Sequence, residues 1–300
     1  MNTISVLLSE YRKRQNLTQQ SLVEKLVQYS DEFKSLNTVT ISRWETGATS
    51  PSIKKKKLLL TFMTATRCVE NDDACYGIVK KRYEQLQQPL SGVFTRNYQY
   101  LIGKIPEQKT EEYTIHSLSD YAYAGDYLDH IIDIEKASQV EGYYNVTADV
   151  LKEWCSHPAS FAIICERKRQ HLGHFIMLKL KNSVAEDIAY NKRDKRFIAQ
   201  EDFCDVNENG TYHVHAFYGS SPKIAAILNV QAYLHLFERQ VHTDNVMIFS
   251  TRKDGVLLTK DYGIKMVAKG KDENYGFNWH GMLSPVEDIL FSDTILKLIF

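Results

Sequence analysis

The stretch from Asn37 to Gly47 constrains the fold more than any other part of the sequence. It reads Asn-Thr-Val-Thr-Ile-Ser-Arg-Trp-Glu-Thr-Gly. Asn37 is a favourable N-cap residue, and Gly47 supplies the left-handed conformation that commonly ends a helix. Ile41 and Trp44 lie three residues apart, so they share one helical face, whereas Arg43 points elsewhere. The stretch therefore predicts a short helix with one apolar face and one face of short polar residues plus an arginine.

The residues before this stretch predict a partner helix. Thr18 is a candidate N-cap, and Leu22, Val23 and Leu26 form an apolar stripe behind it. The two stretches together resemble the Cro/C1-type (XRE) helix-turn-helix family. The resemblance is carried by Leu17-Thr-Gln19, Thr40-Ile-Ser-Arg-Trp-Glu-Thr-Gly47 and Pro51-Ser52. One departure is the segment 27–36 between the two helices, which is several residues longer than the family's tight turn.

This resemblance implies an all-α head over residues 1–66 in which the second helix is a DNA recognition helix. Thr38, Thr40 and Arg43 match family positions that face base edges, and an arginine can read a guanine through O6 and N7. Gln19 matches a residue that contacts phosphate or braces the recognition helix. Two alternatives stay open, namely contact of Arg43 with phosphate alone and a merely solvated Gln19.

The net charge of zero hides an asymmetry along the chain. Residues 1–67 contain 11 Lys and Arg against 5 Asp and Glu, whereas the remainder contains 26 against 32. Lys54 and Lys55 belong to a run of four lysines just after the recognition stretch, and they are either phosphate contacts or a solvated face. Residues 12–14 are also basic, and they either suit the dipole of the first helix or contact phosphate. A basic head on an acidic body fits double-stranded DNA as the partner.

Length and composition indicate a globular protein of about two domains. No run of 18 or more apolar residues occurs and no signal pattern opens the chain, so we expect a cytoplasmic protein without a membrane partner. The five cysteines form no Cys-x-x-Cys pair, so neither zinc nor disulfides are expected. Residues 67–112 are expected to be a helical connector. Because helix-turn-helix proteins usually bind as dimers, we expect a homodimer. The helical part of the connector either pairs the two chains or merely braces the two domains.

From residue 113 onward the pattern alternates strands with helices. The predicted strands are 113–116, 160–165, 173–180, 211–217, 246–250 and 262–267, and the predicted helices are 127–139, 148–155, 222–239 and 254–261. This order resembles the GCN5-related N-acetyltransferase (GNAT) fold over about residues 113–270. The resemblance implies an α/β (α+β) body, residues 113–300, with a mixed, mostly antiparallel sheet. Residues 182–210 are polar and show no clear period.

In the GNAT family, the strand before the long helix ends in a loop that holds the CoA pyrophosphate through backbone N–H groups. Here the loop reads Tyr-Gly-Ser-Ser-Pro-Lys, without the family's arginine and inner glycines. Pro222 also removes one amide donor. Gly219, Ser220, Ser221 and Lys223 could still form an anion-binding turn for acyl-CoA, or they could be simply a loop and a helix start.

No catalytic residue can be assigned from the sequence. The family's general-acid tyrosine falls at Thr259, and a threonine is a poor acid at neutral pH. Tyr262 is near in sequence but is expected to face differently. Glu166 and Asp205 are candidates for a general base only because they lie near predicted strand ends.

Four residues of one predicted strand are candidates for lining a ligand cleft: Tyr212, His213, His215 and Phe217. His213 and His215 lie two residues apart and therefore share one face. Such a pair can bind a metal, but no third ligand has a telling spacing, so no metal is expected.

The favoured interpretation is a sequence-specific DNA-binding transcription regulator whose GNAT-like body senses a small-molecule effector or mediates dimerisation. One alternative is an active acyl-CoA-dependent N-acyltransferase tethered to a DNA-binding head, which the degraded pyrophosphate loop disfavours. The other is a body that binds only protein.

Overall fold

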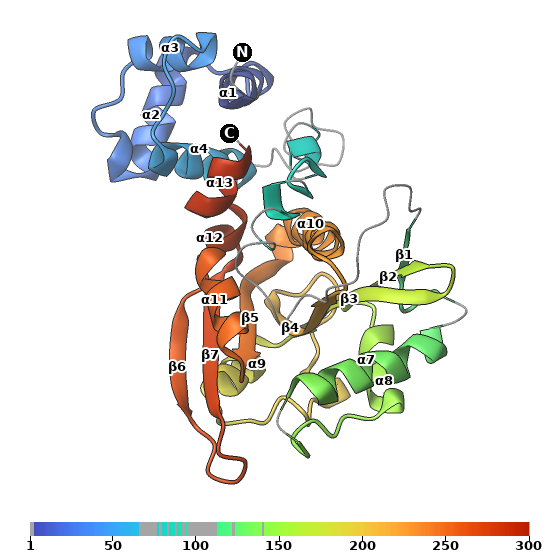
Figure 1. The fold of residues 1–300 in the computed structure, drawn as a ribbon. Coiled ribbons are helices and arrows are strands. Elements are labelled where there is room, and N and C mark those ends of the chain that lie inside the picture. Colours follow the sequence, from blue (N-terminus) through green and yellow to red (C-terminus); the bar gives the residue numbers. More distant parts are fainter. Residues whose placement is uncertain are drawn as a thin grey trace. The chain divides into compact units, whose positions relative to one another are not determined.

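The computed structural model describes residues 3–65, 113–121, 124–139 and 141–299, together with residues 77, 80–82, 84–87, 89–91 and 94. The chain divides into two compact units, one formed by Met1–Gln85 with Leu290–Phe300 and the other by Leu86–Ile289 (Figure 1).

The sequence predicts that the C-terminal residues belong to the body, whereas Leu290–Phe300 belong to the N-terminal unit. Helix α13 (Asp293–Ile299) packs on α4 (Ile53–Ala65) of that unit, and Ile295 and Leu296 are buried. The predicted connector helix lies mostly outside the described residues.

The described part of the N-terminal unit is helical. It contains α1 (Thr3–Arg14), α2 (Gln19–Tyr29), the 3-10 helix η1 (Asp31–Phe33), α3 (Thr38–Thr46) and α4. The long segment between the two predicted helices extends α2 and adds η1, and it is anchored by the buried Phe33 and Leu36. Apolar side chains from all these helices form the core of the unit: Ile4, Leu7, Leu8, Tyr11, Leu22, Leu26, Phe33, Ile41, Trp44, Leu59 and Phe62.

Helix α3 forms as its sequence predicts. The Asn37 side chain accepts a hydrogen bond from the backbone N–H of Thr40 at 2.9 Å, and Gly47 takes a φ of 75° at the other end. Ile41 and Trp44 are both buried. The capping residues and the apolar spacing are therefore sufficient to place this helix.

The C-terminal unit contains one seven-stranded sheet. Its strands are β1 (Thr114–Ser117), β2 (Phe161–Arg167), β3 (Gln170–Leu180), β4 (Gly210–Gly219), β5 (Thr243–Ser250), β6 (Met266–Lys271) and β7 (Asn278–Pro285). They lie in the order β1-β2-β3-β4-β5-β7-β6. Only β4 and β5 pair in parallel, and the other neighbours are antiparallel. The prediction of a mixed, mostly antiparallel sheet is confirmed, although the sequence pattern did not reveal β7.

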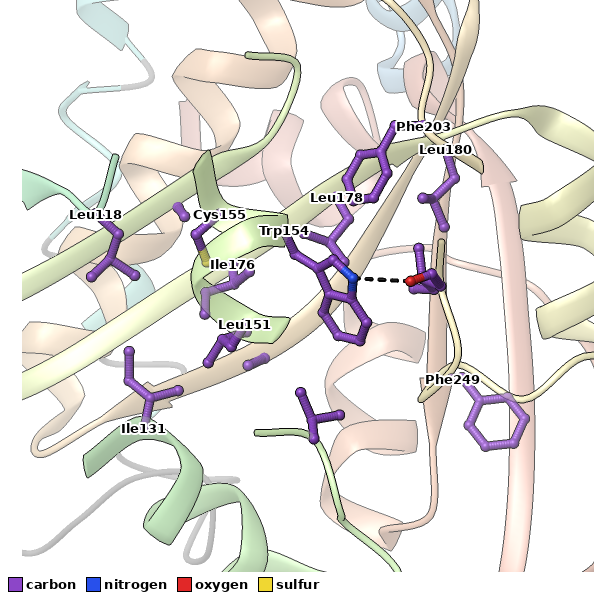
Figure 2. Packing of buried hydrophobic residues seen from close by; sticks show 14 of the residues in the cluster. Leu118, Ile131, Leu151, Trp154, Cys155, Ile176, Leu178, Leu180, Phe203 and Phe249 are labelled. Atoms are coloured by element: carbon purple, nitrogen blue, oxygen red, sulfur yellow. Dashed lines mark hydrogen bonds between the residues drawn. The ribbon is translucent and has the colours of Figure 1, made fainter. Parts of the chain in front are cut away.

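Helices cover both faces of this sheet (Figure 1). Helices α7 (Ala124–Ser138), α8 (Ala148–Ser156) and α9 (Asn182–Ala189) pack on one face around a continuous apolar cluster. Trp154 of α8 lies inside the cluster and donates its indole N–H to the carbonyl of Ile198 at 3.0 Å (Figure 2). Because a buried indole N–H without a partner is costly, this bond fixes the loop after α9 against the core.

Helix α10 (Pro222–Arg239) covers the opposite face, with its predicted limits. Ser221 caps it and Pro222 occupies the first turn, where a missing N–H costs nothing. Helix α11 (Lys253–Asp261) follows β5, and α12 (Val286–Leu290) follows β7. Among the described residues, no helix, α10 included, combines the length and hydropathy needed to cross a bilayer.

Candidate functional site

Helix α3 presents a polar and exposed face away from the core of its unit. Arg43 is exposed, Thr38 is half-buried, and Val39 is 58% exposed. Thr40 is less available, because its hydroxyl donates to Asn37 Oδ1 at 3.1 Å and so belongs to the cap. Val39, which no sequence motif marks, is an exposed apolar side chain on this face.

A buried carboxylate braces α3 against the two preceding helices. Glu45 accepts hydrogen bonds from Arg12 Nε at 2.6 Å and from Gln19 Nε2 at 2.9 Å. Arg12 also donates to the carbonyl of Leu17. The hydrogen bond from Arg12 to Glu45 raises the pKa of the arginine, so its guanidinium stays charged. Of the two roles open to Gln19, the structure contains the bracing contact.

The basic residues around α3 are not all free surface cations. Arg12 lies in the last turn of α1, where a cation suits the helix dipole, and it forms an ion pair with Glu45. Lys54 forms an ion pair with Glu32 of η1 at 2.6 Å, and Lys55 is half-buried. An exposed pair of this kind contributes only about 0–1 kcal/mol, so Lys54 can still exchange its partner for a phosphate.

The C-terminal unit contains a cavity of about 580 Å³ where β4 and β5 separate. The two strands pair only from Gly210 and Thr243 to Val214 and Ile248, and their last residues have no register with each other. The walls come from β3, β4, β5, α7, α10, α11 and the loop after α9. The lining includes Glu135, Phe175, Met177, Lys195, Val214, His215, Phe217, Asn229, Tyr233, Leu236, Phe249, Thr259 and Tyr262. Such a volume suits a small organic ligand.

A β-bulge at His215 determines how β4 contributes to this cavity. Ile176 of β3 pairs with Ala216 and Met177 pairs with Val214, so His215 is the extra residue. A bulge re-aims the side chains that follow it. Phe217 accordingly contacts Phe175, with ring centroids 5.2 Å apart.

The four predicted cleft residues divide into two pairs. His215 and Phe217 line the cavity, whereas Tyr212 and His213 do not. Tyr212 directs its hydroxyl to His235 of α10 at 2.8 Å. His213 is fully buried with its ring 5.6 Å from that of His215, which confirms that the two histidines share a face.

Buried polar groups gather at the α7 side of the cavity. His215 Nε2 lies 3.1 Å from the Tyr144 hydroxyl, and burial lowers the pKa of His215 well below its usual value. Glu135 accepts from Gln139 at 3.2 Å and lies 3.7 Å from His174 Nε2. Lys195 is only 6% exposed, and burial lowers its pKa. Of these groups, His215 was predicted from the sequence, and the others lie in no recognisable sequence motif.

The predicted anion-binding loop is built as a helix start and does not line the cavity. The Ser220 N–H donates to the carbonyl of Leu172 at 2.7 Å, and the Ser221 hydroxyl accepts from the N–H of Ile224. A Cβ on Gly219 would lie 2.7 Å from the backbone nitrogen of Ala225. The ammonium of Lys223 lies over the Tyr113 ring, 5.6 Å from its centroid. These contacts belong to a loop and a helix start, and binding of an anion at this turn stays a prediction.

The other catalytic candidates fall into different places. Thr259 and Tyr262 both line the cavity, but their hydroxyl groups have different partners, Met282 of β7 for Thr259 and Asn229 of α10 for Tyr262. The Tyr262 hydroxyl donates to Asn229 Oδ1 at 3.3 Å, because the end of α11 turns toward α10. Glu166 and Asp205 are not among the cavity residues.

Glu166 lies at a bulge of β2 and accepts a short hydrogen bond from the Tyr127 hydroxyl. Burial raises the pKa of Glu166, but hydrogen bonds from Tyr127 and Tyr121 and the charge of His116 hold it below the usual value. The group is thus an ionised acceptor within a small polar cluster. In the described part of the chain, no group of three or more His, Cys, Asp or Glu side chains could hold a metal ion.

The sequence matches no protein-family model, and no curated protein matches it. Solved structures similar to the chain include FeeM, an N-acyl amino acid synthase from uncultured soil microbes. It is 13% identical, with a TM-score of 0.44 over 60% of this chain and 95% of that one. Another is the ribosomal-protein-S18-alanine N-acetyltransferase from Escherichia coli, at 8% identity and a TM-score of 0.38 over 58% and 94%.

An aminoglycoside 6'-N-acetyltransferase complexed with coenzyme A is similar to the same extent, at 9% identity and a TM-score of 0.38 over 58% of this chain and 97% of that one. At identities this low, a likeness in structure concerns the fold alone. The chemistry of the cavity must therefore be argued from the residues of this chain.

Proposed function

We propose that this protein is a sequence-specific DNA-binding regulator whose C-terminal unit binds a small organic ligand in the β4–β5 cavity. The observation that supports the first part best is the exposed face of α3. Arg43 and Val39 stand on it four residues apart, on a helix whose other face is buried. A helix that enters a major groove needs this combination of a fixed apolar face and a free polar face.

The bracing of α3 adds a second argument for DNA binding. Glu45 joins α3 to Arg12 of α1 and Gln19 of α2, so the exposed face is held rigidly. Direct readout of bases requires side chains placed to within hydrogen-bond distance, and a rigid helix lowers the entropic cost of placing them. The excess of basic residues in this part of the sequence supplies the attraction for phosphate.

The cavity supports the second part of the proposal. A pocket of about 580 Å³ with mostly apolar walls and few polar groups is typical of a small-molecule site. A ligand would regulate DNA binding only if it binds one conformation or dimer arrangement better than another. Two copies of the chain on a two-fold related DNA site are the expected assembly.

The test of the DNA-binding proposal is selection of duplexes from a randomised library by the full-length protein. We expect one enriched motif with the wild type. Arg43→Ala should bind the enriched duplex about 1–3 kcal/mol more weakly and lose preference at the base pair that Arg43 reads. Lys25→Ala, which removes an exposed charge from α2, is the matched control and should retain the motif. Unchanged preference in Arg43→Ala would remove the base-reading role.

Acyl transfer in the cavity is a second candidate, supported by the position of the cavity between the separated ends of β4 and β5. His215 is the candidate there for moving a proton, because its imidazole lines the cavity and lies 3.1 Å from the Tyr144 hydroxyl. Release of free thiol from acetyl-CoA or longer acyl-CoAs, compared between the wild type and His215→Ala, tests this candidate. Absence of release with every acyl-CoA would leave the cavity as a binding site alone.

A further inference from the structure

Lys195 carries a buried amine for whose charged form the described residues supply no ion-pair partner. Its side chain lines the cavity and is only 6% exposed. Among the residues that the structure describes, none forms a hydrogen bond or an ion pair with its ammonium. Its closest recorded neighbour is the ring of Phe249, whose centroid lies 5.9 Å from Nζ. Burying an ammonium without a partner is costly, so a protein that retains one usually supplies a counter-ion from elsewhere.

The acidic groups near Lys195 are already occupied. Asp194, the preceding residue, accepts two hydrogen bonds from Arg196 Nε at 2.8 and 2.9 Å. Glu135 accepts from Gln139 and lies beside His174. Both carboxylates attract Lys195 only at longer range, where they partly offset the lowering of its pKa by burial. The cavity is also lined by Arg252, but its guanidinium already donates to Asp254 and to the carbonyl of Ser138. Among the described lining residues, Lys195 is therefore the basic group whose hydrogen-bond donors remain available.

The remaining groups around Lys195 cannot act as its counter-ion. His213 and His215 are the nearest polar side chains of β4, and both are held neutral by burial and by the charge of Lys195. Most of the rest of the lining is apolar, with side chains from β3, β4, β5 and α10: Phe175, Met177, Val214, Phe217, Leu236, Val246 and Ile248. The complement of this cavity is an apolar body that carries one anionic group.

We infer that the cavity binds a small carboxylic acid with an apolar tail, its carboxylate paired with Lys195. The inference rests on the ligand-binding half of the proposed function and is independent of DNA binding. A single carboxylate matches a single ammonium, and the pair would be desolvated by the apolar walls that receive the tail. An uncharged analogue of the same shape leaves the ammonium unpaired and should bind less tightly.

The experiment compares acids with their methyl esters on the full-length protein. Decanoate and 3-phenylpropionate are titrated by calorimetry and in thermal melts beside methyl decanoate and methyl 3-phenylpropionate. At least one acid should raise the melting temperature by several degrees and bind about tenfold or more tightly than its ester. If neither acid binds better than its ester, the inference is wrong, whatever the outcome of the DNA selection.

Three variants locate the effect at Lys195. Lys195→Met keeps the length and apolar stem but removes the charge, and should bind acid and ester equally. Lys195→Arg keeps the charge and should retain the preference for the acid. Lys192→Met, which removes an exposed lysine of the same loop, is the matched control and should behave as the wild type. Undiminished preference for the acid in Lys195→Met would overturn the inference. If that variant fails to fold, the acid-to-ester ratio of the wild type decides.

Discussion

At the residue scale, Glu45 organises the N-terminal unit. Its two carboxylate oxygens accept bonds from Arg12 and Gln19, which lie on two other helices. Because Glu45 is 7% exposed, water cannot replace these partners at low cost. The charged pair thus fixes the position of the proposed recognition helix in addition to any contribution to stability.

Glu45→Ala should therefore lower the free energy of unfolding of the protein by about 2 kcal/mol, since Arg12 and Gln19 lose a buried acceptor. The measurement is urea denaturation followed by far-UV circular dichroism. Glu24→Ala removes an exposed carboxylate on α2 that accepts a hydrogen bond from Gln20, and it should change the free energy of unfolding by less than about 0.5 kcal/mol. Equal effects of the two substitutions would show that Glu45 is not a bracing residue.

At the element scale, the sequence predicted those helices whose ends and apolar faces are determined by residues close together in the chain. Helix α3 follows from its Asn37 cap, and the predicted helices 148–155 and 222–239 correspond to α8 and α10. Helix α9 was not predicted, because its apolar residues span only two turns in a polar region. The cavity was not predictable, because it depends on the bulge at His215 and on the separation of two strands distant in sequence. Lys195 and Glu135 both line the cavity, and no sequence motif marks either residue.

The contact of β7 with α9 gives an element-scale prediction. A Cβ on Gly281 would lie 1.7 Å from the carbonyl oxygen of Ala189, so the strand and the helix could not keep their separation. Gly281→Ala should destabilise the protein by about 3 kcal/mol. Gly125→Ala is the matched control, because a Cβ there meets nothing within 4 Å and lies in helix α7. It should be neutral or stabilising by up to about 1 kcal/mol. Similar melting temperatures for the two variants would contradict this packing.

At the scale of the whole molecule, the protein combines a basic helical unit with an acidic unit that contains a buried cavity. The second unit also buries several histidines, and burial lowers the pKa of His171 and His213 to about 3 and that of His235 to about 4. These imidazoles are neutral in the folded state. Their burial makes the stability of the protein sensitive to mild acid.

The sign of this pH dependence follows from which state takes up protons. Below the usual histidine pKa of about 6.5 the unfolded chain gains protons, whereas the folded chain does not until about pH 3 to 4. Stability should be full above pH 6.5 and should fall steadily toward pH 4. Differential scanning calorimetry across this range measures it, and His213→Gln should flatten the slope. A melting temperature constant between pH 7 and 4.5 would contradict the buried neutral histidines.

The central claim is that the helical unit binds a specific DNA sequence through α3. The most direct measurement is fluorescence anisotropy of the full-length protein with the duplex enriched by selection and with a scrambled duplex, at several salt concentrations. We predict at least about 10³-fold tighter binding to the enriched duplex, with log affinity falling linearly with log salt concentration. Equal affinity for the two duplexes at every salt concentration would contradict the claim.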